Sequence, residues 1–236
     1  MSQITAAGKR ISEVLLPFCI YYLVNSIIIT LGFTFLESRK QVLQLTVAGS
    51  SAEILLQALV RMVAFLAAAL AILSEYRKEK YLAGTYEMRQ LSFKSIIILF
   101  VTGAILALLL NLIWFQIPFL AENEAYQRVA ANQHSYPLWL ALPLYGIFSP
   151  LAEELLFRGI IFSRIRRCLS VFPAILISSF LFGIFHGNPV QAAYGMVMGV
   201  ALAYIYHKFN TMNSVFLFHS GANIAVCLFT VISSYS

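Results

Sequence analysis

The sequence predicts an all-α protein, a polytopic bundle of about seven transmembrane helices, and two observations carry this prediction. Hydrophobic residues make up 60% of the 236 residues, charged residues make up 11%, and the mean hydropathy is +0.81. A soluble fold of this length needs far more polar residues to cover its surface. The apolar residues are also gathered into runs that approach the roughly 20 residues needed to cross about 30 Å of hydrocarbon.

The apolar runs define the expected elements in order. We expect spans near residues 14–35, 54–74, 95–117, 137–163, 171–187, 190–208 and 212–233. The fifth and sixth spans meet at Gly187-Asn188-Pro189, where glycine relaxes the turn and proline removes a backbone donor, so this connection should be tight. We divide the chain into N-terminal helices with a cytoplasmic loop at 1–94 and a helical core at 95–236.

Basic residues predict the orientation of the bundle. Eleven of them fall on the side that holds the N-terminus, namely Lys9, Arg10, Arg77, Lys78, Lys80, Arg89, Lys94, Arg164, Arg166, Arg167 and Lys208. Only Arg39, Lys40 and Arg128 fall on the other side. Because cytoplasmic loops carry the excess of positive charge, we expect a cytoplasmic N-terminus. Topology and anionic lipid headgroups explain the net charge of +6, so the expected partner is the lipid bilayer and not nucleic acid.

Two adjacent glutamates inside the fourth expected span, in Pro150-Leu-Ala-Glu153-Glu154-Leu-Leu-Phe-Arg158, are the most informative feature. A carboxylate at membrane depth is costly unless it is paired, protonated or solvated. Arg158 lies four residues after Glu154 on the same helix face, which predicts an ion pair. Glu153 is rotated by about 100° from its neighbour and needs another polar partner. We therefore expect Glu154 to serve the architecture and Glu153 to serve chemistry.

Two later spans provide polar partners for Glu153. The fifth span carries Phe182 and His186, and the seventh carries His219 and Asn223. The members of each pair are four residues apart, so each pair projects from one helix face. The depth of each residue in the membrane can be counted from the expected cytoplasmic turns with the helical rise per residue. This depth is similar for all of these residues. We expect Glu153, His186, His219 and Asn223 to form one layer inside the bundle.

The patterns EExxxR, FxxxH and HxxxN, in this order on separate spans, resemble the signature motifs of the CAAX-processing and bacteriocin-processing (CPBP, or Abi) intramembrane endopeptidases. All signature positions are present: Glu153, Glu154, Arg158, Phe182, His186, His219 and Asn223. The resemblance covers about residues 137–228. It implies a peptidase in a bacterial plasma membrane that cleaves hydrophobic or membrane-associated peptides, with the first glutamate and the first histidine activating water.

The residue types agree with peptide hydrolysis, which needs a base, an oxyanion donor and an acid. Glu153 is the natural base, helped by His186, while Asn223 and His219 can donate hydrogen bonds to the oxyanion. Glu154, Arg158 and Phe182 would support these residues.

A metal-assisted mechanism is open as well. Glu153, His186 and His219 could ligate Zn²⁺ and leave a position for water, as in metalloproteases. The HExxH spacing that would make zinc a strong prediction is absent. The three cysteines are scattered and form no metal-binding pattern.

Two other classes of function fit parts of the pattern. A non-catalytic immunity or interaction protein could use the same scaffold to neutralise a membrane-active peptide. A small transporter or proton relay would also place Glu and His within the bilayer, although we find no repeated half and no paired broken helices. The full set of base, oxyanion donor and histidine at one depth favours the peptidase.

Overall fold

The computed structural model describes residues 2–40, 50–82, 90–118, 122–124, 127, 131 and 135–233. Arg89 and Arg128, which were counted for the orientation, lie outside the described residues. The described part contains helices and no strands, which confirms the all-α prediction. Six of its helices are long and apolar enough to cross a membrane. The fifth expected span is the shorter apolar helix α10 (Val171–Ile184) of 14 residues.

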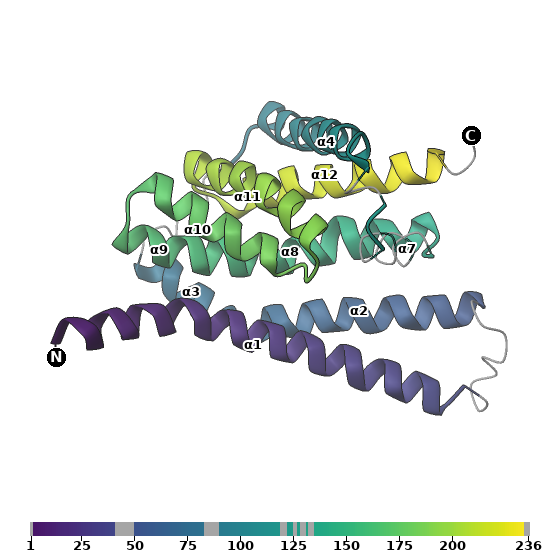
Figure 1. Ribbon diagram of the computed structural model, residues 1–236, viewed down its shortest axis with the longest axis horizontal. Helices are drawn as coiled ribbons and strands as arrows, with labels where there is room; N and C mark the ends of the chain where they lie inside the picture. Colours follow the sequence, from purple (N-terminus) through teal and green to yellow (C-terminus); the bar gives the residue numbers. More distant parts are fainter. Residues whose placement is uncertain are drawn as a thin grey trace.

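The long helices outside the centre of the bundle are α1 (Ser2–Ser38), α2 (Ser51–Ala71), α4 (Phe93–Phe115), α11 (Pro189–Phe209) and α12 (Met212–Ser233). In Figure 1, α1 and α2 lie along one edge of the bundle, and α4 lies along the opposite edge against α12. The start of α1 and the end of α12 lie at opposite ends of the molecule.

The centre is a continuous 31-residue helix, Leu138–Cys168, which is the most buried of the possible spans. It consists of α7 (Leu138–Pro143), the π-helical η1 (Leu144–Phe148), α8 (Ser149–Glu154), the π-helical η2 (Leu155–Phe162) and α9 (Ser163–Cys168). The two π-helical stretches flank α8, which carries both glutamates. Because π-helical turns are rare and occur frequently at functional sites, they mark α8 as a special position.

The first π-helical stretch leaves one backbone carbonyl without a helical partner. The N–H of Ser149 bonds to the carbonyl of Leu144, five residues earlier, instead of to that of Tyr145. Pro150, the next residue, has no N–H to donate. The carbonyl of Tyr145 therefore depends on a partner from another helix, because an unpaired buried carbonyl is costly.

The turn between α10 and α11 is as tight as the sequence predicts. Gly187 has a positive φ of 76°, a conformation that glycine adopts without strain. The side chain of Asn188 then caps α11 by accepting a hydrogen bond from the N–H of Gln191, at 2.8 Å. Pro189 occupies the first turn of α11, where its missing N–H costs nothing. The helix α10 ends at Ile184, and His186 lies between this end and the turn at Gly187.

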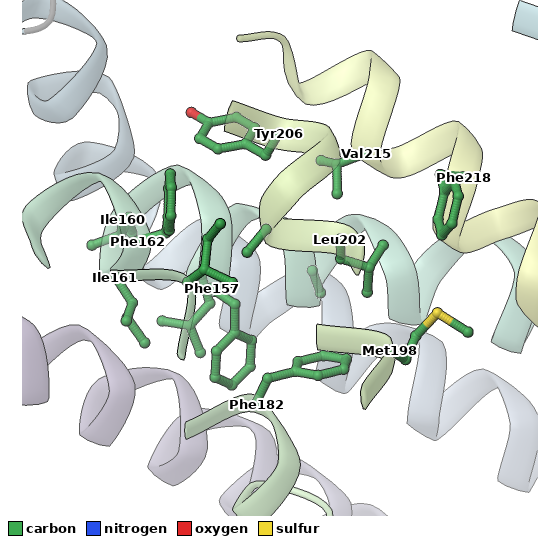
Figure 2. Close-up of a cluster of buried hydrophobic side chains, with 14 of the residues drawn as sticks. Phe157, Ile160, Ile161, Phe162, Phe182, Met198, Leu202, Tyr206, Val215 and Phe218 are labelled. Carbon is green, nitrogen blue, oxygen red and sulfur yellow. The ribbon is translucent and has the colours of Figure 1, made fainter. Parts of the chain in front are cut away.

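A core of apolar side chains joins the central helix to α10, α11 and α12. Figure 2 shows Phe157 of η2 beside Phe182 of α10, with Leu202 of α11 and Val215 of α12 above them. The rings of Phe157 and Phe182 meet edge to face, with their centroids 5.1 Å apart. This core fixes the rotation of the helices that carry the signature residues.

The helices α4 and α12 approach each other at glycines. A methyl group at Gly103 of α4 would lie 2.0 Å from the carbonyl oxygen of Phe218, and one at Gly221 of α12 would lie 2.2 Å from that of Phe100. Small residues allow such close backbone contact between membrane helices. Since Gly221 lies between His219 and Asn223, this contact determines where both side chains point.

The basic residues expected on the cytoplasmic side gather at one end of the bundle. Arg164 of α9 is buried and pairs with Glu79 of the short helix α3 (Leu73–Leu82), at 2.7 Å. Lys80 of α3 lies 5.7 Å from the ring centroid of Tyr206, near the end of α11. The helices α3 and α9 and the end of α11, whose basic residues the charge pattern assigned to one side of the membrane, thus lie together in the structure.

We predict that Gly103→Ala lowers the free energy of unfolding by about 1–3 kcal/mol, because the added methyl group forces α4 and α12 apart. Thermal unfolding of the purified protein in detergent would measure the change. Ile105→Val, on the exposed face of α4, is the matched control and should leave the unfolding temperature unchanged. Equal stability of the two variants would contradict the close backbone contact.

Candidate active site

The predicted ion pair between Glu154 and Arg158 is present and has no exposed surface. The Arg158 Nη1 atom lies 2.9 Å from Glu154 Oε1, and both side chains are 0% exposed. Arg158 also donates from Nη2 to the carbonyl of Gly199 on α11, at 3.2 Å. Its guanidinium carbon lies 4.4 Å from the ring centroid of Phe182. One arginine thereby links the central helix to α10 and α11.

His219 contacts both glutamates, so Glu154 has a second partner besides Arg158. The Nδ1 atom of His219 lies 2.7 Å from Glu154 Oε1, and its Nε2 atom lies 3.9 Å from Glu153 Oε2. Since the carboxylate can only accept, Nδ1 carries the proton in the first contact. Glu154 therefore orients the imidazole so that Nε2 faces Glu153.

Glu153 keeps one oxygen uncommitted. Its side chain is buried, at 6% exposure, and Oε1 accepts a hydrogen bond from the hydroxyl of Ser149, one turn earlier on the same helix face. Oε2 has no hydrogen bond from any described residue, since His219 is too distant for one. A carboxylate oxygen without a donor is suited to accept a proton from water.

Ser149 was not among the residues expected in the site. The spacing of four residues from Glu153 is the local signal that could have identified it.

His186 and His219 both contact the ring of Phe182. The ring centroids lie 5.0 Å and 5.9 Å from that of Phe182, edge to face in both contacts. The Nδ1 atom of His186 lies 2.9 Å from the carbonyl oxygen of Phe182. A carbonyl only accepts, so Nδ1 is protonated and Nε2 is free to take a proton. Among the described residues, no hydrogen bond or ion pair joins His186 to Glu153.

Asn223 does not contact the glutamates directly. Its Nδ2 atom donates to the carbonyl of Tyr145, at 2.8 Å, and so supplies the partner that the π-helical stretch η1 lacks. The amide lies one turn further along α12 than His219, on the side of the central helix that carries Ser149. One N–H of the amide is left for another acceptor.

The proposed zinc ligands meet some of the requirements of a metal site and not others. In both imidazoles Nδ1 forms a hydrogen bond with an oxygen atom, and Nε2 forms none with a described residue. Histidine ligands of zinc commonly have this arrangement. Within the described part of the chain, however, no three His, Cys, Asp or Glu side chains come close enough together to hold a metal ion. The described residues are therefore not arranged as a preformed zinc site.

The fold and the site define a class of protein: a polytopic helical membrane protein with carboxylate, guanidinium and imidazole groups buried at the centre of its bundle. Residues 135–225 match the family model described as Type II CAAX prenyl endopeptidase Rce1-like. This confirms the predicted resemblance to the CAAX-processing endopeptidases. No curated protein and no solved structure matches the chain.

The matched segment begins directly before the central helix and ends within α12. It thus contains the helices that carry every signature residue. Because that family is one of proteases, the match supports a peptidase-type function for this segment.

We predict that Glu154→Ala lowers the free energy of unfolding by about 3–5 kcal/mol, because it leaves Arg158 buried without a counter-charge. Replacing both partners, as in Glu154→Gln with Arg158→Met, should cost less than the single change, since no unpaired charge is then buried. Thermal unfolding in detergent would compare the two. A single variant as stable as the parent would show that the pair is not buried as described.

Proposed function

We propose that the protein is an intramembrane endopeptidase that hydrolyses a hydrophobic or membrane-associated peptide with water activated by Glu153. The observation that carries this proposal is the uncommitted Oε2 atom of a buried glutamate, which faces His219 and lies within a peptidase-family segment.

In the proposed reaction Glu153 removes a proton from a water molecule at Oε2 while the water oxygen attacks the scissile carbonyl. The carbonyl electron pair moves onto its oxygen, which becomes the oxyanion. Ser149 holds the other oxygen of Glu153 and so fixes the direction in which the base faces. Preorganised groups of this kind act strongly in a site that excludes water.

His219 is the proposed donor to the oxyanion. Glu153, Glu154 and Arg158 together carry one net negative charge when all are ionised, and each of them is nearly inaccessible to water. This role requires a second proton on His219, at Nε2. The protonated Nε2 atom can then donate a hydrogen bond to the oxyanion, with the free N–H of Asn223 as a second donor.

His186 is proposed to complete the proton transfers. Its free Nε2 atom can accept a proton from water or pass one to the leaving amine, the role that histidine commonly has in hydrolysis. The contact with Phe182 and the hydrogen bond at Nδ1 hold the ring in place. Because no direct bond joins His186 to Glu153, a water molecule or the substrate would connect them.

The depth of the site restricts the proposed substrates to peptides that enter the bilayer. The family is described as prenyl endopeptidases, so we propose to compare a fluorogenic hydrophobic peptide with the same peptide carrying a prenylated CAAX end. A role in the maturation of bacteriocins or in self-immunity is compatible with the same chemistry. In that case a variant without peptidase activity would also fail to protect cells. A non-catalytic immunity protein would still protect cells when peptidase activity is absent.

We predict that Glu153→Ala lowers kcat by about 10³-fold or more and that His186→Ala lowers it by about 10²–10⁴-fold, because each removes a proton acceptor. Cleavage of the fluorogenic peptide by purified protein in detergent would measure both. His207→Ala, at an exposed position near the end of α11, is the histidine control and should keep full activity. Full activity of a well-folded Glu153→Ala variant would contradict the proposed mechanism.

Zinc assistance is a separate proposal with its own test. If zinc takes part, extended chelation should abolish cleavage and added Zn²⁺ should restore it, with one metal ion bound per chain by elemental analysis. If Glu153 acts on water alone, protein freed of metal should cleave at the full rate. Zinc binding by the Glu153→Ala variant, compared with the parent, would show whether that carboxylate is a ligand.

A further inference from the structure

Arg61 of α2 is a charged residue in the middle of a possible membrane span. The helix, Ser51–Ala71, has 21 residues and is apolar enough to cross a membrane, and Arg61 is its eleventh residue. An arginine near the end of a span reaches the lipid headgroups with its long side chain. A charge at the centre of a span is costly and indicates a functional site by default. Arg61 lies outside the matched segment 135–225, so the signature residues do not account for it.

The guanidinium of Arg61 is held by aromatic residues and has no counter-charge among the described residues. Its Nε atom donates a hydrogen bond to the hydroxyl of Tyr136, at 2.9 Å, and its carbon lies 5.2 Å from the ring centroid of Phe33 on α1. Glu53, the acidic residue of α2, accepts a hydrogen bond from the amide of Gln57 instead, at 3.3 Å. The side chain of Arg61 is partly exposed, and its Nη1 and Nη2 atoms form no hydrogen bond with a described residue. Both nitrogens are therefore available to an anion.

A series of contacts connects Arg61 with the candidate active site. The ring of Tyr136 meets that of Tyr145 edge to face, with the centroids 6.1 Å apart. Tyr145 belongs to η1, against which α2 packs, and its carbonyl accepts the hydrogen bond of Asn223. Tyr145 precedes Glu153 by eight residues, which is about 12 Å along the helix. About four residues of an extended peptide cover this length, so one short peptide can extend from Glu153 to the level of Tyr145.

The chemistry and the depth of Arg61 together select a carboxylate as its ligand. The planar guanidinium binds a carboxylate through two parallel hydrogen bonds. A lipid phosphate has the same kind of charge, but the headgroups lie at the edges of a hydrocarbon layer of about 30 Å, about 15 Å from its centre. A peptide that enters the bilayer to be hydrolysed brings its own C-terminal carboxylate to the depth of Arg61.

We propose that Arg61 is a substrate-binding residue, which holds the C-terminal carboxylate of the peptide while Glu153 acts on a bond near that end. The Nη1 and Nη2 atoms donate to the two carboxylate oxygens, and Nε keeps its hydrogen bond to Tyr136. The substrate supplies the counter-charge that the described part of the fold lacks, and no covalent bond changes at this position. The inference rests on the proposed peptidase function and extends its substrate site to α2.

The test compares a fluorogenic hydrophobic peptide that ends in a free carboxylate with the same peptide ending in a carboxamide. In the parent protein the carboxamide should raise KM about 10- to 100-fold, as expected for the loss of hydrogen bonds between charged groups. The value of kcat should change by less than about twofold, because Arg61 does not touch the reacting atoms. Arg61→Gln should raise KM for the carboxylate peptide to the carboxamide value and leave KM for the carboxamide peptide unchanged. Both peptides are assayed with one preparation, so a partial loss of folded protein cannot produce this result.

Arg39→Gln is the matched control, because Arg39 is exposed directly after α1 and contacts only the ring of Phe35, at 6.0 Å. This variant should prefer the carboxylate peptide as strongly as the parent does. If Arg61→Gln does not fold, Arg61→Lys decides, since it keeps the charge and loses the paired hydrogen bonds. Its preference for the carboxylate peptide should be weaker than that of the parent, and an unchanged preference would overturn the inference.

Three other results would overturn the role of Arg61. The first is an equal KM for the two peptides in the parent, and the second is a preference that survives in Arg61→Gln. The third is an equal loss for both peptides in Arg61→Gln, together with a parent activity that depends on anionic phospholipid in vesicles, because Arg61 would then bind a lipid phosphate. If the parent cleaves both peptides equally well, only the role of Arg61 fails. If it cleaves neither peptide, the peptidase proposal fails as well.

Discussion

The buried pair of Glu154 and Arg158 is the interaction on which the rest of the structure depends. Two opposite charges without access to water need polar partners, although Glu154 Oε2 and Arg158 Nε have none among the described residues. Here the partners come from three other helices: the carbonyl of Gly199 on α11, the ring of Phe182 on α10 and the imidazole of His219 on α12. The need to satisfy this pair therefore brings together the helices that carry the candidate catalytic groups.

A second constraint acts through the backbone of the central helix. The π-helical stretch before Pro150 leaves the carbonyl of Tyr145 without a helical donor, and Asn223 supplies one. The amide of Asn223 is thus held against the central helix while one N–H stays free. Architecture and chemistry are combined in the same residues, because an intramembrane site has no bulk water to satisfy its polar groups.

Part of the site was predictable because it depends on spacing along one helix. Glu154 and Arg158 lie one turn apart, and so do Phe182 and His186, so their contacts follow from helical geometry alone. Ser149 was overlooked although it has the same spacing from Glu153. The partner of His219 could not be predicted, because it depends on the rotation of α12 against the central helix, which the close contact with α4 determines.

By itself the sequence determined that this is a helical membrane protein, where its apolar helices lie, and that a carboxylate pair with an arginine is buried among them. These features follow from hydrophobicity and from local helical geometry, which act over a few turns. Only the tertiary structure decided that His219 lies between Glu154 and Glu153 and that Asn223 donates to a backbone carbonyl of the central helix. These contacts join residues far apart in the chain, and their geometry is set by how whole helices pack.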